Sequence, residues 1–205
     1  MRRRPYDIDT HGTPKFVTFD YIDLNQIDRI STFRSAASHD YSDDSETCRS
    51  MKHYYAPKAG VDWSTVDIYS PANGTVDRVI AEWAGYQVHV TSQDYPAFVF
   101  ILFHVNLNPM RSPGDTVTLG QHFGTHISSL TPSDIAIRVA TPDGAKLVSF
   151  FSVMTDSLFL GYQGRGVATR DDATISAAAQ NADSLDCSDE AFGTSGTLTN
   201  WVLLN

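Results

Sequence analysis

Short runs of apolar residues, separated by turn residues, dominate residues 60–155. A sustained repeat of 3.6 residues is nearly absent there, so the pattern favours strands over helices. Residues 98–105 are apolar at almost every position, which is typical of a central strand buried on both faces. The other candidate strands cover residues 66–69, 75–80, 87–91, 135–140 and 146–151. The pattern therefore predicts an all-β body.

One turn in this body has a specific signal. Asn73-Gly74 is a dipeptide suited to positive φ, and it stands between two candidate strands. We therefore expect a hairpin that joins residues 66–69 to residues 75–80.

The two ends of the chain have weaker patterns. The N-terminal segment is polar and mixed, with a weak strand signal at residues 15–22 and a short helix signal near residues 24–30. Near the other end, the Ala-rich residues 175–182 are the best helix candidate. Residues 201–204 are apolar enough to dock as an edge strand.

The length sets the domain organisation. The chain has 205 residues and a mass of 22.6 kDa, which fits one domain of ordinary size. We expect a single domain over residues 1–205. In it, residues 1–50 wrap the body, residues 51–155 form the β core, and residues 156–205 are a C-terminal extension.

Charge and hydropathy exclude some partners. The 15 Lys and Arg residues stand against 24 Asp and Glu residues, a net charge of −9, so the average surface would repel nucleic acid. The longest purely apolar run is residues 97–103, whereas a membrane span needs about 20 residues. Arg2, Arg3 and Arg4 are not followed by the apolar stretch of a signal peptide. Either the chain is cytosolic, or an export signal was removed or lies outside this sequence.

The two cysteines, Cys48 and Cys187, are not in a metal-binding or CxxC spacing. They are either free buried thiols or one long-range disulfide. We favour the disulfide, because the low charged fraction is compatible with secretion. Closing so long a loop would contribute roughly 4 to 5 kcal/mol in the chain-entropy model.

Two segments carry a family resemblance. Residues 68–76 read IYSPANGTV, and residues 114–125 read GDTVTLGQHFGT. The pair resembles the duplicated hybrid motif of barrel-sandwich folds, which lipoyl and biotinyl carriers share with lysostaphin-type (LytM-like) zinc metallopeptidases. Carriers are modified on a lysine at a hairpin tip, and the turn here has none. The resemblance therefore favours the peptidases, and it implies an all-β barrel-sandwich fold.

The similarity to the peptidases extends over roughly residues 31–140. Phe33-Arg34 followed by His53 resembles the segment that leads into the family's His-x-x-x-Asp motif. Residues 85–88 and 103–105 resemble its Gly-Asn-x-Val and Tyr-Ala-His strands, and residues 133–138 fall where the family has His-x-His-Phe-Glu.

The resemblance also implies a site. In the family, zinc is held by the His and Asp of His-x-x-x-Asp and by the second His of His-x-His, and two further histidines assist catalysis. His53 matches the first ligand and His104 the Tyr-Ala-His histidine. Pro57 stands at the Asp ligand, Ala136 at the last His ligand, and Asp134 at the other His. Two of the three zinc ligands are therefore replaced, which should abolish ordinary zinc binding in that geometry.

A second His-x-x-x-Asp unit offers a compensation. His39 and Asp43 form it, and with His53 and His104 they could rebuild a centre for a divalent metal, most simply zinc, with Asp134 beside it. The alternative is that His39 and Asp43 hydrogen-bond within a polar loop and that the other histidines are relics.

His104 and Asp134 are the candidate catalytic residues. Strand alternation places His104 on one face with Phe100 and Leu102, so we expect it to be enclosed and to need a partner or a metal. Asp134 could orient the imidazole, act as a ligand, or form a plain hydrogen bond with it. The remaining histidines, at positions 11, 89, 122 and 126, are expected at the surface.

Two functions follow as hypotheses. The first is an extracellular or periplasmic metallopeptidase-like hydrolase that acts on a cell-wall peptide or glycan polymer, with the metal as Lewis acid and His104 or Asp134 handling the proton. The second is an inactive relative that binds peptidoglycan or another glycan, or regulates a partner. Five aromatic residues flank the expected groove and could stack on sugars or simply pack: Tyr54, Tyr55, Trp63, Trp83 and Tyr86. Nucleophilic catalysis has little support, because there is no Gly-x-Ser-x-Gly motif.

Overall fold

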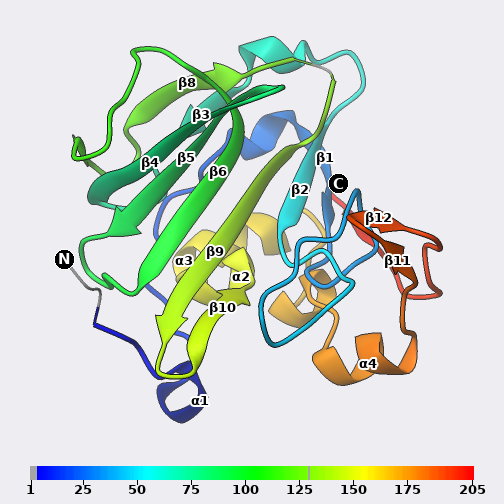
Figure 1. Ribbon diagram of the computed structural model, residues 1–205. Coiled ribbons are helices and arrows are strands. Elements are labelled where there is room, and N and C mark those ends of the chain that lie inside the picture. Colours follow the sequence, from blue (N-terminus) through cyan, green and yellow to red (C-terminus); the bar gives the residue numbers. More distant parts are fainter. Residues whose placement is uncertain (1–3, 129) are drawn as a thin grey trace.

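The computed structural model describes residues 4–128 and 130–205 (Figure 1). Its main feature is a sheet of 11 strands in the order β13-β1-β2-β9-β6-β5-β4-β7, with β10 paired to β9, and β8 paired to β3 and β6. Every pairing between these strands is antiparallel. The expected all-β fold is confirmed.

The strands of the large sheet are β1 (Ile27–Ser31), β2 (His53–Pro57), β3 (Asp67–Tyr69), β4 (Gly74–Glu82), β5 (Gly85–Ser92), β6 (Phe98–Leu107), β7 (Thr116–Val117), β8 (His122–His126), β9 (Ser133–Thr141), β10 (Gly144–Val148) and β13 (Trp201–Leu203). A separate hairpin consists of β11 (Cys187–Ser188) and β12 (Ala191–Phe192). The α-helices are short: α1 (Ile8–His11), α2 (Phe150–Val153), α3 (Asp156–Gln163) and α4 (Ala177–Ala182). Three 3-10 helices, η1 (Leu24–Gln26), η2 (Trp63–Thr65) and η3 (Arg170–Ala173), complete the set. None of the described helices is long and apolar enough to cross a bilayer.

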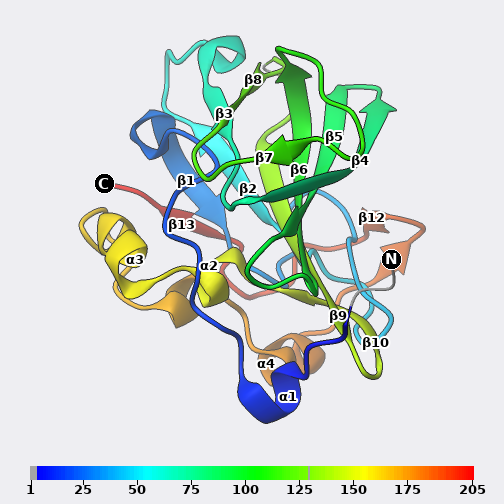
Figure 2. The same ribbon diagram turned by 90° about the vertical axis from the view of Figure 1, so that its left-hand side faces the viewer.

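Strand β6 lies at the centre and is buried on both faces, as its apolar sequence predicts. Phe98, Phe100 and Leu102 belong to the larger core, which also takes side chains from α2 and α3. Val99 and Ile101 belong to a smaller core on the other face. Figure 2 shows α2 and α3 lying to one side of the strands. The sheet therefore separates two apolar layers of unequal size.

The expected hairpin between β3 and β4 is wrong. β3 pairs with β8, whereas β4 pairs with β5 and β7. The Asn73 side chain accepts a hydrogen bond from the backbone N–H of Leu119 at 2.8 Å, so it stabilises a contact with a distant loop. Gly74 is required because an added Cβ would clash with the Thr91 carbonyl of the neighbouring strand. The Asn73-Gly74 dipeptide therefore contacts distant backbone and does not form a two-residue hairpin turn.

The ends of the chain add strands to the sheet. The helix expected near residues 24–30 is only the turn η1, and β1 follows it with Ile27 and Ile30 buried. The weak strand signal at residues 15–22 yields isolated bridges at Val17 and Ile22. The C-terminal edge strand is confirmed as β13, which pairs with β1. The Ala-rich helix is confirmed as α4.

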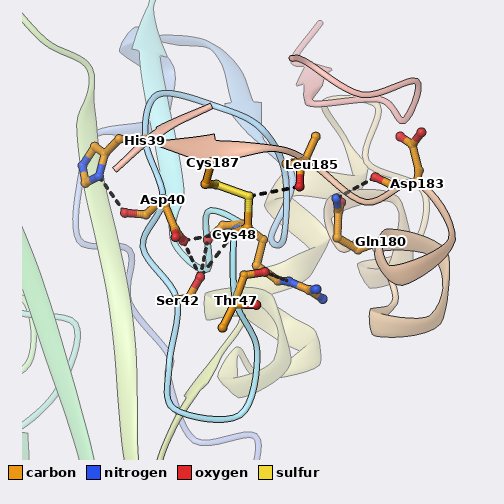
Figure 3. The surroundings of a disulfide bond; sticks show 10 residues. His39, Asp40, Ser42, Thr47, Cys48, Gln180, Asp183, Leu185 and Cys187 are labelled. Atoms are coloured by element: carbon orange, nitrogen blue, oxygen red, sulfur yellow. Dashed lines mark hydrogen bonds between the residues drawn. A yellow bond between two sulfur atoms is a disulfide. The ribbon is translucent and has the colours of Figure 1, made fainter. Parts of the chain in front are cut away.

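A disulfide joins Cys48 to Cys187, as favoured from the sequence. The bond connects the loop before β2 to the β11–β12 hairpin, two segments 139 positions apart (Figure 3). The backbone N–H of Asp40 also donates to the Glu190 carbonyl at 2.7 Å. The loop is therefore held against the C-terminal hairpin by a covalent bond and a hydrogen bond.

Candidate functional site

Lys52, His104 and Asp134 form a buried charged cluster where β2, β6 and β9 run side by side. The Lys52 Nζ lies 2.6 Å from Asp134 Oδ2, and the His104 Nε2 lies 3.2 Å from Asp134 Oδ1. Asp134 is completely buried, and the Lys52 side chain is 2% exposed. Tyr54 of β2 lies opposite Asp134 in the strand register. Lys52 is two residues earlier, just before β2 begins, and its long side chain extends to the same carboxylate. The expected proximity of His104 and Asp134 is observed, while their catalytic role stays a prediction.

A β-bulge in β6 turns His104 toward Asp134. In the larger core, the β6 residues change from even positions, ending at Leu102, to odd positions, beginning at Val105. His104 itself has φ +60°, the left-handed conformation that a non-glycine residue rarely adopts. The alternation that would place His104 beside Phe100 and Leu102 therefore does not hold. The bulge, and not a regular strand, brings His104 next to Asp134.

Both ring nitrogens of His104 face acceptors. Nδ1 lies 3.1 Å from the Ala84 carbonyl, and Nε2 faces the Asp134 carboxylate. A carbonyl and a carboxylate can only accept, so both nitrogens carry a proton and the ring is an imidazolium. Burial works to lower the pKa of His104, but the hydrogen bond and the charge of Asp134 raise it above its ordinary value. Both contacts with Asp134 therefore favour the protonated ring.

Lys52 is held as a cation by its surroundings. Its Nζ lies over the rings of Tyr41, Tyr54 and Phe103, at 4.7, 4.9 and 4.1 Å from their centroids. Burial works to lower the pKa of Lys52, but the charge of Asp134 raises it above its ordinary range. Burial works in the opposite direction on the pKa of Asp134, which the Lys52 charge and His104 hold below its usual value. The carboxylate is thus neutralised by two cations within the fold.

His53, predicted as a metal ligand, lies apart from this cluster. Its Nδ1 donates to the Ser31 carbonyl at 2.8 Å, and its Nε2 accepts from the Ser149 hydroxyl at 2.8 Å. Because side chains alternate along β2, His53 points away from the face that carries Tyr54 and Lys52. Burial lowers the pKa of His53 to about 4, so the ring is neutral. It lies among core residues, with both nitrogens in hydrogen bonds.

The other two predicted ligands belong to a polar loop. His39 Nδ1 donates to the Asp40 carbonyl at 2.9 Å and lies 3.8 Å from the Glu190 carboxylate. Asp43 accepts hydrogen bonds from the backbone N–H groups of Ser45, Glu46 and Leu147 at 2.8, 3.1 and 2.7 Å. Both side chains therefore take part in hydrogen bonds of the segment before β2, and Asp43 also accepts one from β10.

As placed, these residues do not fit a zinc ion. Of His39, Asp43, His53, His104 and Asp134, only the last two meet, and no three His, Cys, Asp or Glu side chains of residues 4–128 and 130–205 are grouped as ligands. Zinc requires a neutral imidazole lone pair and an available carboxylate. His104 has both nitrogens protonated toward acceptors, and the Asp134 carboxylate is already paired with an ammonium group.

The aromatic residues expected beside the groove differ in exposure. Tyr54, Tyr55 and Trp63 are buried, with at most 3% exposed, so they serve packing. Trp83 is 75% exposed at the tip of the β4–β5 hairpin, and its ring centroid lies 5.9 Å from that of His104. The neighbouring Glu82 is half-buried, and burial raises the pKa of its carboxyl above the ordinary value. An exposed indole and a carboxyl group therefore lie at the edge of the cluster.

Two histidines expected at the surface are buried, and that expectation is wrong. His89 is 4% exposed, with Nε2 2.6 Å from Gln87 Oε1. His126 is fully buried in β8, with its ring 4.5 Å from that of Trp63, and burial lowers its pKa to about 4. The pattern predicts a surface strand face for His89 and a loop for His126, but neighbouring strands and η2 cover them. His11 and His122 are exposed or half-exposed, as expected.

Lys52 was missed by the sequence analysis. The available signal for a buried lysine was its position in the mostly apolar run from Met51 to Ala56, which also contains Tyr54 and Tyr55. A buried lysine requires a carboxylate partner, and Asp134 was already a candidate.

Comparisons with known proteins give little more. No family model and no curated protein matches the chain. Among solved structures, a chain from the structure of the SpoIIQ–SpoIIIAH pore-forming complex is similar, with 18% sequence identity and a TM-score of 0.47, covering 77% of this chain and 100% of that chain. A similarity of this size does not define a family. The class that the structure itself defines is an all-β protein with a disulfide and a buried Lys-Asp-His cluster.

Proposed function

We propose that this protein is a binding module for a cell-wall polymer, and that the Lys52–Asp134–His104 cluster has no catalytic role and stabilises the binding face. One observation carries the proposal: the Lys52 ammonium is paired with Asp134 at 2.6 Å, in the position that the sequence resemblance would assign to catalysis. The second hypothesis from the sequence, an inactive relative, is thereby favoured over the first.

The protonation states support a structural role for the cluster. A general base needs a free lone pair, and an imidazolium with two N–H groups committed to acceptors has none. The Asp134 carboxylate is completely buried and in contact with two cations, so it has no access to a substrate proton. The cluster therefore has no group ready to accept a proton as a general base.

The ligand is inferred from the edge of the cluster. Trp83 presents an exposed indole, whose flat apolar surface suits the face of a sugar ring. Glu82 accepts a hydrogen bond from the Gln87 side chain at 3.0 Å, so polar groups lie next to the indole. Of the peptide and glycan parts of a wall polymer, this combination favours the glycan. The disulfide supports an oxidising compartment, extracellular or periplasmic.

A sedimentation assay tests this proposal. The protein is incubated with insoluble peptidoglycan, and the bound fraction is measured for the wild type and for Trp83→Ala. The matched control is Leu160→Ala, because Leu160 is 63% exposed on α3, away from the cluster. We expect about a tenfold loss of affinity in Trp83→Ala, equivalent to ~1.4 kcal/mol, and none in the control. Equal binding by both variants, or no binding by the wild type, would contradict the proposal.

A further inference from the structure

We propose that Ser149 and His53 form a nucleophile and base pair, and that the pocket they underlie hydrolyses small, uncharged acyl esters. This site is separate from the Lys52–Asp134–His104 cluster and does not depend on the binding function proposed above. It also gives His53 a role that differs from the metal ligand expected from the sequence.

The argument begins with the proton positions. His53 Nδ1 lies 2.8 Å from the Ser31 backbone carbonyl, which can only accept, so Nδ1 carries the proton. Nε2 is therefore unprotonated and directed at the Ser149 Oγ, 2.8 Å away. A nucleophile hydrogen-bonded to a base, which a third group orients, is the arrangement that activates a serine hydroxyl. Here the third group is a backbone carbonyl.

Ser149 is buried, with 5% exposed, and borders a pocket on one side. It lines a pocket of about 590 Å³ between α1, β10 and η3, together with Phe33, Ser152 and Thr174. The hydrogen bonds that Ser149 Oγ accepts, from the Phe151 N–H at 3.2 Å and the Thr174 hydroxyl at 3.3 Å, are longer than its bond to His53. His53 itself is 1% exposed, and burial lowers its pKa to about 4, so it is a weak base shielded from water behind the serine.

The pocket lining indicates the substrate class. Its charged members nearly balance, with three cations and four anions: Arg34, Lys146, Arg170, Asp9, Asp43, Glu46 and Asp171. Most of these charges are already paired, as in Arg34 with Glu46 and Lys146 with Asp9. These paired charges already have partners and are not available to bind a charged substrate. An uncharged substrate is therefore favoured. An ester is favoured over an amide, because a dyad without a carboxylate orienter activates its serine weakly and esters are the more reactive acyl compounds.

The reaction has two stages. Ser149 Oγ bonds to the acyl carbon while its proton passes to His53 Nε2, and the ester C–O bond then breaks as the alcohol leaves with that proton. Water next attacks the acyl-serine and gives a proton to His53 Nε2. The acid is released, and the proton returns to Ser149 Oγ.

Active-site labelling tests the proposal. The wild type is treated with a fluorophosphonate probe and with p-nitrophenyl acetate, and the labelled residue is located by peptide mass spectrometry. We expect the label on Ser149, and at least a tenfold loss of hydrolysis in Ser149→Ala and His53→Gln. Ser64→Ala is the control, because Ser64 is an exposed serine of η2 outside the pocket and its hydroxyl donates to Asp62. It should retain labelling and activity.

A second variant separates access from reactivity. Both native cysteines are in the disulfide, so Ser149→Cys would introduce one free thiol, which iodoacetamide should modify if the pocket is open. Modification of Ser149→Cys with no fluorophosphonate labelling of the wild type would show an accessible but unreactive serine and overturn the proposal. An unmodified Ser149→Cys, a label on another residue, or unchanged hydrolysis in folded Ser149→Ala would also overturn it.

Discussion

Lys52 and Asp134 form an ion pair inside the protein, with 2.6 Å between Nζ and Oδ2 and at most 2% of either side chain exposed. Removing one partner of such a pair leaves the other charge buried without compensation, which is far more costly than removing both. Asp134 also contacts His104, so one carboxylate connects β9 to β6 and to the residue just before β2.

Lys52→Met should therefore lower the free energy of unfolding by about 3 to 5 kcal/mol. The double variant Lys52→Met with Asp134→Asn should lose less than the sum of the two single variants, because it removes both charges. Urea unfolding monitored by circular dichroism measures all three. Lys15→Met is the control, since Lys15 pairs with Asp156 at 2.8 Å on the exposed surface and should show no comparable loss. Strictly additive single effects would show that the pair is not coupled.

The raised pKa of His104 predicts a loss of stability at alkaline pH. The unfolded imidazole titrates near pH 6.5 and the folded one above it, so the folded state holds its proton more tightly. The stabilisation is complete below about pH 6.5 and disappears as the pH rises through the folded pKa. In His104→Asn this part of the pH dependence should vanish. Titration of the His104 ring by NMR locates the folded pKa, and a value below 6.5 would contradict the imidazolium assignment.

His53 and His126 predict the opposite trend in acid. Burial lowers both pKa values to about 4, so at a pH between about 4 and 6.5 the unfolded chain binds protons that the folded chain does not. Stability should decline as the pH falls from about 6.5 to about 4, by up to about 3 kcal/mol for each ring. His53→Gln should remove roughly half of this slope. Chemical unfolding at half-unit pH intervals measures the slope, and a wild type with flat stability over this range would refute the neutral, buried state of the two rings.

The sequence predicts those parts of the fold that follow from local pattern. Strands β5, β6 and β9 were found because apolar and polar positions alternate or stay apolar along them. The pairing of β3 with β8 was missed, because Asn73-Gly74 indicates a local hairpin, whereas β3 and β4 pair with strands farther along the chain.

The candidate site shows the same division. His104 and Asp134 were found from their strand positions, but the bulge that brings them together is a tertiary feature without a sequence signal. Lys52 was missed because no spacing motif marks a lysine that pairs across strands. The separation of His39, Asp43 and His53 follows from loop and strand directions that a His-x-x-x-Asp spacing does not encode.

The backbone at His104 predicts an unusual order of stability among variants. His104 has φ +60°, where a residue with a Cβ is strained and glycine is not. Both His104→Ala and His104→Gly lose the contacts with Asp134 and Ala84, but only the glycine variant relieves the strain. We expect His104→Gly to be more stable than His104→Ala by about 1 kcal/mol, although glycine is normally the less stable choice within a strand. Thermal unfolding of the two variants decides the order, and a less stable glycine variant would argue against the left-handed conformation.

Zinc should neither bind nor stabilise the protein. The carboxylate that would coordinate a metal is paired with Lys52 and faces His104 Nε2, so binding would break a buried ion pair and remove the proton from that nitrogen. After chelation and incubation with zinc, elemental mass spectrometry should find well under one equivalent of metal. The melting temperature should also be unchanged by zinc, because a ligand that binds only the folded state would raise it. One equivalent of zinc that is lost in the double variant His53→Ala with His104→Ala would restore the metallohydrolase hypothesis and refute the non-catalytic assignment of the cluster.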